Sequence, residues 1–161
     1  MRGGHGIGSN YWDLLPFGWD DMYATSQYYA SLLAMASVEQ AILDNPAWNV
    51  PRGACALDPA ELSKHAAAVR TEANRKFWDA RKGRFVACID SAGAKHDYGF
   101  TFLNLEAVYY GFATPEHAAR IMEWITGARE VEGDTARGAE IYHWRFAPRA
   151  TTRRNEEYYF W

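Results

Sequence analysis

Apolar residues recur every three or four positions from about Asp20 to Leu43. This is the spacing of side chains on one face of an α-helix. Asn45 and Pro46 end the pattern, since proline does not fit inside a helix. We therefore predict a long first helix with one wide buried face, made of Trp19, Met22, Tyr23, Ser26, Tyr29, Ala30, Leu33, Ala34, Ser37, Val38, Ala41 and Ile42.

A second helix is marked at its start by Asp58 as the N-cap, Pro59 in the first turn and Glu61 as the capping-box glutamate. It should end near Ala80. Its apolar stripe is narrow, which is typical of a helix covered on one side only. The stripe consists of Leu62, Ala66, Val69, Ala73 and Phe77.

The next stretch, "GRFVACID", "SAGAK" and "HDYGF", reads as a small β-hairpin: a β-rich run, a turn of small residues and a return. A third helix is predicted from Thr101 to Tyr110, closed by Gly111. A fourth opens at Thr114 and Pro115 and ends at Gly127. We predict an all-α fold with a β-hairpin insertion, as a single domain over residues 1–161.

Successive helices with short connections pack antiparallel, so the first and third helices should point the same way. The segments that precede them, "NYWDLLPFGWDD" and "HDYGFTF", would then lie at one end of the molecule. The long segment after the fourth helix, "EGDTARGAEIYHWRFAPRATTRRNEEYY", should return there. These are the most aromatic, acidic and irregular stretches of the chain. We predict that they form the walls of one site.

Composition narrows the function. The chain has 161 residues, of which 48% are hydrophobic, enough for a sizeable core. Its net charge of −3 argues against partners such as nucleic acid or anionic lipid. No run is apolar enough for a membrane span, and no signal peptide is visible, so we expect a cytoplasmic location by default. Two cysteines make no disulfide framework, which fits a reducing compartment.

Three motifs resemble segments of the six-hairpin glycosidases, the (α/α)6-toroid glycoside hydrolases. They are "GSNYWDLLPFGWDDMYATSQYYASLLAMA", "DYGFTFLNLEAVYYGFAT" and "EGDTARGAEIYHWRFAPRATTRRN". The resemblance covers nearly the whole chain. It implies that the chain is part of an (α/α)6 toroid, with two of the six helical hairpins. Uncovered flanks of the inner helices would then be open to self-association.

Glycoside hydrolysis needs two carboxyl groups, one protonated and one ionised. Asp13 and Asp97 are our first candidates, because flanking aromatic rings would desolvate a carboxyl and raise its pKa. Asp134 is a third. Further carboxyl candidates on these segments are Asp20, Asp21, Glu132 and Glu140, and Glu106 would face the ring interior from the third helix. Alternatively, Asp97 is a turn residue, Asp20 and Asp21 cap a helix, and Glu106 is a structural group. If Asp13 and Asp97 form the pair, Asp13→Asn and Asp97→Asn should each abolish hydrolysis and spare the fold.

Aromatic rings stack on sugar faces, and polar side chains bond hydroxyls at the rim. The competing explanations are core packing for each ring and local ion pairs for the arginines. The predicted substrate-binding residues are Trp12, Trp19, Asp21, Tyr98, Glu140, His143, Trp144, Arg145 and Arg149.

No cofactor or metal is predicted. The glycine-rich "GGHGIGS" follows no strand, and the histidines lack ligand spacing. The leading function is carbohydrate recognition, with glycosidic-bond hydrolysis by a carboxylate pair in any complete form. The alternatives are a non-catalytic sugar-binding fragment and a structural module whose helix flanks bind a partner chain.

Overall fold

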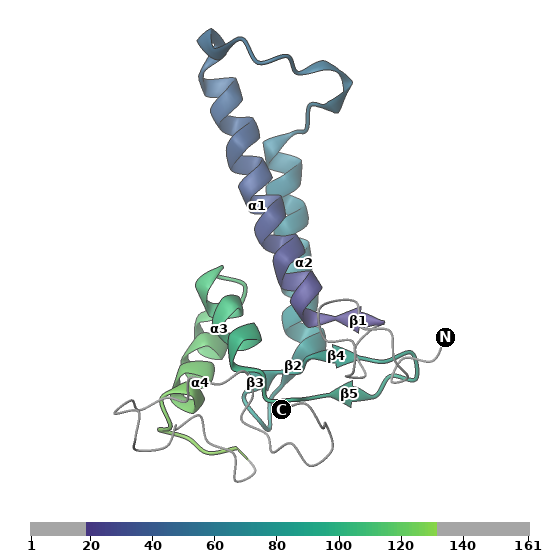
Figure 1. Ribbon diagram of the computed structural model, residues 1–161, viewed down its shortest axis with the longest axis vertical. Coiled ribbons are helices and arrows are strands. Elements are labelled where there is room, and N and C mark those ends of the chain that lie inside the picture. Colours follow the sequence, from purple (N-terminus) through teal and green to yellow (C-terminus); the bar gives the residue numbers. More distant parts are fainter. Residues whose placement is uncertain (1–18, 132–161) are drawn as a thin grey trace.

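The computed structural model describes residues 19–131 (Figure 1). This part is mostly helical, with a small antiparallel sheet and a separate two-stranded pair, so the coarse fold prediction is confirmed. Its α-helices are α1 (Met22–Asp44), α2 (Pro59–Phe77), α3 (Thr101–Tyr109) and α4 (Pro115–Ile125). Its strands are β1 (Asp20–Asp21), β2 (Trp78–Asp79), β3 (Arg84–Phe85), β4 (Cys88–Ile89) and β5 (Lys95–His96).

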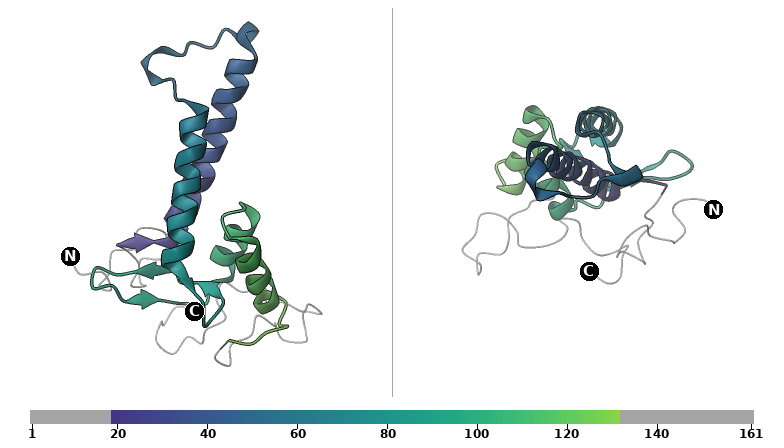
Figure 2. Two further views of the ribbon diagram at one scale, coloured as in Figure 1. Left: turned by 180° about the vertical axis from the view of Figure 1, so that it is seen from behind. Right: turned by 90° about the horizontal axis from the view of Figure 1, so that it is seen from above.

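The helices alternate in direction, as predicted. α1 and α3 run away from the strands, and α2 and α4 return to them (Figures 1 and 2). At 1.5 Å per residue, the 23 residues of α1 span about 34 Å and the 9 residues of α3 about 14 Å. The α1–α2 hairpin therefore projects beyond α3 and α4. We call the projecting part (residues 33–69) the arm, and the remainder of the described chain the base.

Two small sheets form the lower part of the base. The order β1-β4-β5 makes one antiparallel sheet, and β2 pairs with β3 in the other. The predicted hairpin is confirmed at β4 and β5. The run at 83–90 is not one strand, however. β3 pairs with β2, which directly follows α2, whereas β4 pairs with β1 and β5.

The turn between α3 and α4 is fixed to α2 by polar side chains. Arg70 donates to the Phe112 and Ala113 carbonyl oxygens at 3.1 and 3.0 Å. Asn74 donates to the same Phe112 oxygen at 2.8 Å and accepts from the His117 ring. These contacts set how far up the α1–α2 hairpin the short helices reach.

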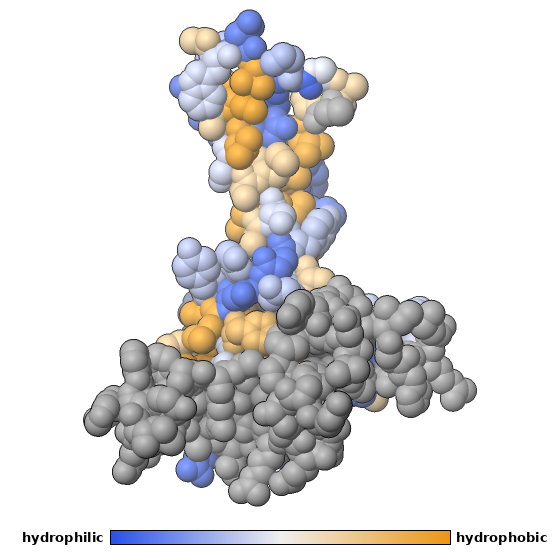
Figure 3. All heavy atoms as spheres, in the orientation of Figure 1, coloured by the Kyte–Doolittle hydropathy of each residue, from blue (hydrophilic) through white to orange (hydrophobic). Residues whose placement is uncertain are grey.

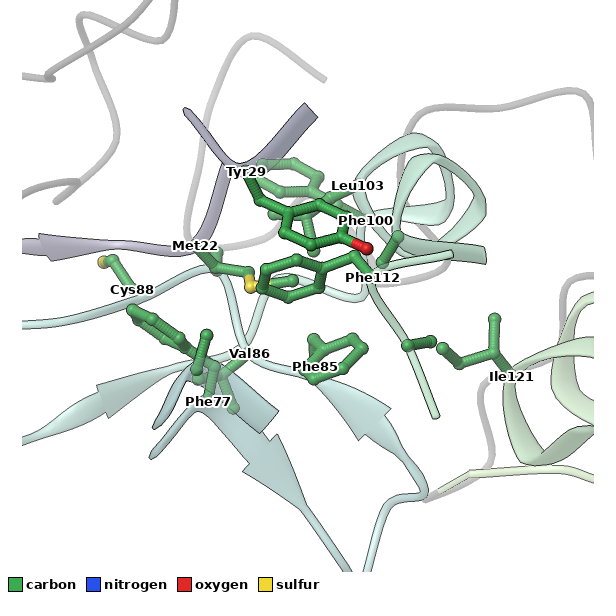
Figure 4. Close-up of a cluster of buried hydrophobic side chains, with 14 of the residues drawn as sticks. Met22, Tyr29, Phe77, Phe85, Val86, Cys88, Phe100, Leu103, Phe112 and Ile121 are labelled. Carbon is green, nitrogen blue, oxygen red and sulfur yellow. The ribbon is translucent and has the colours of Figure 1, made fainter. Parts of the chain in front are cut away.

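The core lies where α1, α2, α3 and the strands meet (Figure 4). Met22, Phe85, Leu103 and Phe112 are almost fully buried there. Asn104 links α3 to β3, because its side-chain oxygen accepts from the Phe85 N–H at 2.9 Å. Such satisfied buried polar groups help to specify one packing arrangement.

Several element boundaries differ from prediction. α1 begins at Met22, since the Asp21 side chain caps it through the Ala24 N–H. α2 ends at Phe77 rather than near Ala80, because the next two residues pair with β3. α3 and α4 end one and two residues early. Gly111 and Gly127 follow these ends with positive φ, as expected of helix-terminating glycines.

The predicted buried face of α1 is only partly correct. Its buried residues are Met22, Ser26, Tyr29, Leu32, Ala36 and Glu39. Val38, which we predicted inside, is 53% exposed, and Leu43 and Met35 are also exposed. Figure 3 shows apolar side chains along the visible side of the arm. The pattern marked apolar positions correctly, but burial requires a neighbour that α3 is too short to supply.

The arm contains one strongly buried carboxylate. Glu39 accepts from Arg52 at 2.6 Å and from the Leu57 N–H at 3.2 Å. These bonds hold the connection between α1 and α2, which includes two short 3-10 turns (Pro46–Trp48 and Gly53–Cys55), against the helix.

Candidate functional site

The sheet brings the N-terminal ends of α1 and α3 together. Met22 N–H donates to the Ala87 carbonyl at 3.0 Å, and Ala87 N–H donates to the His96 carbonyl at 2.9 Å. The chain then passes through Asp97 into α3. The prediction that the segments before these two helices share one end is confirmed for residues 19–21 and 96–101. The third predicted wall lies outside the described residues.

Asp97 is buried among cations rather than among aromatic rings alone. It accepts from Arg84 at 2.9 Å, from Lys82 at 2.9 Å and from the Gly99 N–H at 2.9 Å. Arg84 is fully buried and lies 4.6 Å from the centre of the Trp124 ring.

These contacts correct the predicted role of Asp97. Desolvation raises the pKa of Asp97, but Arg84, Lys82 and the Gly99 amide together outweigh it, and the pKa is lowered. The predicted raised pKa is therefore wrong. A carboxylate held ionised in this way is unsuited to the acid role. Its substitution by Asn should also disturb the fold, contrary to our expectation from sequence.

The residues at the start of α1 have structural partners. Asp21 caps α1, which agrees with the alternative reading of that residue. Asp20 forms an ion pair with Lys76 at 2.8 Å. Trp19 is 73% exposed and has a φ of 65°, which is rare for a bulky residue. Its ring is therefore available to a ligand, whereas the Asp21 carboxylate already serves the helix.

Tyr98 is 4% exposed and packs against Phe100, with ring centres 5.4 Å apart. This favours the core-packing alternative over sugar stacking for this ring. The other predicted site residues lie outside the described part of the chain: Trp12, Asp13, Glu132, Asp134, Glu140, His143, Trp144, Arg145 and Arg149.

A carboxyl whose pKa is raised, unlike that of Asp97, lies between α1 and α3. Glu106 is partly buried, and desolvation raises its pKa, although a 2.6 Å hydrogen bond from the Gln27 side chain counteracts part of the shift. Tyr23 lies close to Glu106. Burial is the largest cause of a raised pKa at Tyr23, and the charges of Glu106, Tyr110 and Asp21 raise this pKa further. We call Tyr23, Gln27, Phe102, Glu106 and Tyr110 the α1–α3 seam.

Helical spacing explains why the seam exists. Phe102 and Glu106 lie four positions apart on α3, and Tyr110, the C-cap of α3, comes four positions later; Tyr23 and Gln27 have the same spacing on α1. The Tyr23 and Phe102 rings meet edge to face at 5.7 Å. The sequence left two interpretations of Glu106, a carboxyl facing the ring interior and a structural group, and favoured the second. The available signal was this spacing of a carboxyl between two aromatic residues.

The described residues contain no cluster of three or more His, Cys, Asp or Glu side chains that could hold a metal ion. No helix in that part is long and apolar enough to cross a membrane.

Comparison of the chain with protein-family models, curated proteins and solved structures gives no match. The resemblance to six-hairpin glycosidases therefore stays a prediction, and function is argued from the residues.

Proposed function

We propose that this chain is a carbohydrate-active, glycoside hydrolase-like protein that contacts its sugar at the base, with hydrolysis by a carboxyl pair in any complete form. In this proposal it is part of an (α/α)6 toroid. The observation that carries it is Glu106, a carboxyl of raised pKa bordered by tyrosines and a phenylalanine.

The chemistry of a glycosidase acid fits Glu106. The group that protonates the leaving oxygen must hold its proton near the working pH, which requires a raised pKa. Partial burial supplies this, and the group remains partly exposed, so a glycosidic oxygen is able to reach it. Tyr23 and Tyr110 offer hydroxyls and ring faces for sugar contacts. The second carboxyl is assigned to Asp13, which precedes α1 in the sequence.

Asp97 has a positioning role in this proposal. Its bonds to Arg84 and Gly99 fix the segment that leads into α3, and α3 carries Glu106. Substitution of Asp97 would therefore displace Glu106, although Asp97 itself is not the proton donor.

The test compares Glu106→Gln with Glu116→Gln. Glu116 is an exposed carboxyl on α4 whose pKa is lowered, so it is a matched control. Thermal melts of the full chain with a panel of mono- and oligosaccharides identify the sugar, since a ligand that binds only the folded state raises the melting temperature. We expect Glu106→Gln to abolish hydrolysis of that sugar's glycosides, while Glu116→Gln leaves it unchanged.

The pH dependence gives a readout that does not need a substrate. Because the pKa of folded Glu106 is raised, the folded state binds more protons than the unfolded state between the two pKa values. The contribution of Glu106 to stability is therefore largest at low pH and falls as pH rises through the raised pKa. Glu106→Gln should remove this pH-dependent component of stability.

The activity test has its own contradicting outcome. Full hydrolytic activity in Glu106→Gln would show that another carboxyl is the acid.

A second function, a module that binds a partner chain, is favoured by the exposed apolar residues of the arm, such as Val38 and Trp48. A cooperative melt that no sugar shifts would support it over carbohydrate binding.

A further inference from the structure

The Gln27 side chain contacts the Glu106 carboxyl from α1. Its Nε2 donates to Oε2 of Glu106 at 2.6 Å, which is short for an N–H···O hydrogen bond. Within residues 19–131, Gln27 is the side chain whose hydrogen bond acts on the pKa of this carboxyl. The bond uses Oε2, so Oε1 is the oxygen left for a ligand at the α1–α3 seam.

Contacts on both sides of Gln27 fix its place opposite the carboxyl. Four residues before it, the Tyr23 ring meets the Phe102 ring edge to face at 5.7 Å. Two residues after it, the Tyr29 hydroxyl donates to the Gly111 carbonyl oxygen at 3.4 Å. These contacts join α1 to α3 and to the turn that follows α3, and the carboxyl lies between Phe102 and Gly111 in the sequence. The hydrogen bond is therefore held in a fixed register, as a preorganised site requires.

An uncharged donor is what an acid requires at this position. A cation there would stabilise the carboxylate and lower its pKa, as Arg84 does at Asp97, where desolvation alone would raise it. Burial raises the pKa of Glu106, and the neutral amide of Gln27 lowers it by less, so the pKa stays raised. Gln27 thus holds the carboxyl in place and leaves it able to carry a proton.

The hydrogen bond also distinguishes the two oxygens of the protonated carboxyl. A carboxylic acid has a hydroxyl oxygen, which carries the proton and donates, and a carbonyl oxygen, which accepts. Because Gln27 donates to Oε2, the bond favours the form with the carbonyl at Oε2 and the proton at Oε1.

We propose that Gln27 is the positioning residue of the acid: it holds Oε2 of Glu106 as the carbonyl oxygen, and Oε1 carries the proton given to the leaving group. This inference rests on the proposed function, in which Glu106 is the acid. The proton on Oε1 passes to the glycosidic oxygen, which keeps the electron pair of the broken C–O bond. Water supplies a hydroxyl group to the sugar carbon, and its remaining proton goes to one of the two carboxylates.

The Gln27 bond acts on the rate because it strengthens as the proton leaves. A hydrogen bond to an ionised acceptor is roughly twice as strong as one between neutral groups. Negative charge grows on Glu106 during the transfer, so the bond is stronger in the transition state than in the ground state. Interactions of this kind raise kcat. Loss of the bond should therefore lower kcat and leave KM nearly unchanged.

The first experiment needs no substrate. Infrared spectroscopy of the full chain at low pH isolates the C=O stretching band of protonated Glu106, as the difference from the same chain carrying Glu106→Gln. A carbonyl that accepts a hydrogen bond absorbs at lower wavenumber than a free one. Gln27→Met removes the donor but keeps a long side chain that is well tolerated in helices. We expect this variant to move the band to higher wavenumber.

Gln40→Met is the matched control for the infrared experiment. Gln40 also lies on α1 and donates to a carboxylate, that of Asp44, at 2.8 Å, but this bond is exposed and stays within the helix. Gln40→Met should leave the Glu106 band in place, and thermal melts verify that both variants fold. A band that Gln27→Met does not move, or that both variants move equally, would overturn the proposal.

A second experiment separates positioning from a merely structural contact between helices. NMR titration of the Glu106 carboxyl carbon should give a higher pKa in Gln27→Met, because the bond that lowers this pKa is lost. The alkaline limb of the pH–rate profile should move up with it. Gln27→Lys should move both in the opposite direction, since a cation stabilises the carboxylate. A structural contact alone would change the melting temperature and leave the pKa and the pH–rate profile in place, which would refute the positioning role.

Kinetics on the sugar identified by the melts complete the test. We expect Gln27→Met to lower kcat about tenfold or more, with KM nearly unchanged. If Glu106→Gln is inactive while Gln27→Met keeps its kcat, the acid stands and only the role of Gln27 is refuted. If Glu106→Gln keeps full activity, the proposed acid is wrong, and the positioning role fails with it whatever the infrared band shows.

Discussion

The lower half of α1 and its upper half belong to the same helix but have different surroundings. Near Met22 and Tyr29 the helix is covered by α2, α3 and the strands, and its neighbours are nearly all buried. Beyond Leu33, within residues 19–131, α1 packs mainly on α2, and Met35, Val38 and Leu43 are exposed. The base is thus a packed core, and the arm is a two-helix extension of it.

Polar groups differ in the same way. The base contains several separate polar contacts between elements: the Asp97 pairs with Arg84 and Lys82, the Asn74 bond to the Phe112 carbonyl, and the Asn104 bond to the Phe85 N–H. The arm has Glu39 with its bonds to the connecting loop. This comparison teaches that α1 continues as a regular helix beyond the region covered by α3 and the strands, where its main packing partner is α2.

The largest effect should come from breaking the buried ion pair of the base. Asp97→Asn removes the carboxylate that pairs with Arg84, which is fully buried. Removing one partner of a buried pair typically costs about 3–5 kcal/mol. We expect urea denaturation to show a loss of this size. Asp44→Asn, in the arm, should change stability by less than about 0.5 kcal/mol.

The same group predicts an acid sensitivity that provides a second check. The pKa of folded Asp97 is lowered, so its stabilisation is present above the pKa of an unfolded aspartate, about 3.9, and is lost as pH falls through the folded value. Asp97→Asn should lack this part of the pH dependence. If Asp97→Asn lost stability at low pH as the original chain does, Asp97 would not be the source of this acid sensitivity.

A core truncation comes next in size. Leu103 is completely buried in the base, and Leu43 is 47% exposed in the arm. Leu103→Ala should lower the free energy of unfolding by about 2–5 kcal/mol, since it leaves a cavity. Leu43→Ala, measured by the same chemical denaturation, should cost well under 1 kcal/mol. Equal losses would show that the arm is covered in solution.

Within the arm, Glu39 should be the most sensitive polar residue. Glu39→Ala removes the acceptor of Arg52 and of the Leu57 N–H, which should cost about 1–3 kcal/mol. Its neighbour Gln40 is exposed and bonds Asp44 within the same helix, so Gln40→Ala is a suitable control with little effect. Comparable melting temperatures for both variants would contradict the anchoring role of Glu39.

The smallest effect is expected at Val38. Val38→Ser should shift the free energy of unfolding by no more than about 0.5 kcal/mol, because the side chain is already half exposed. Hydrogen exchange should show the same gradient, with amides near Val38 exchanging faster than amides near Tyr29. Uniform protection along α1 would argue against the division into base and arm.

Local signals in the sequence predicted the helices well. Asp58 and Thr114 cap α2 and α4 through their side chains, as their positions before proline indicated. The strand pairing of Trp78 with Phe85 was missed, since it replaces helix by a contact that no local pattern describes. The exposure of Val38 was missed for a related reason: periodicity indicates a face but not whether another element covers it.

The site was harder to predict than the fold. The aromatic neighbours of Asp97 suggested a raised pKa, but its partner Arg84 comes 13 positions earlier and reaches it only through the folding of the strands. Glu106 was undervalued because its burial depends on α1, and the Gln27 side chain that contacts it is 79 residues away in the sequence. The pKa of Asp97 is set by its cationic partners and that of Glu106 by burial against α1, and a single sequence reveals neither.

The unbroken course of α1 has a mechanical consequence. The helix contains neither glycine nor proline from Met22 to Asp44, and sharp kinks in helices occur mostly at such residues. It therefore acts as one stiff rod whose lower half is set in the base. A force applied to the arm would therefore be transmitted along α1 to Tyr23 and Gln27, the first of which lies near Glu106 and the second of which bonds it. Displacement of the arm would thus change the geometry around the Glu106 carboxyl through the single helix α1.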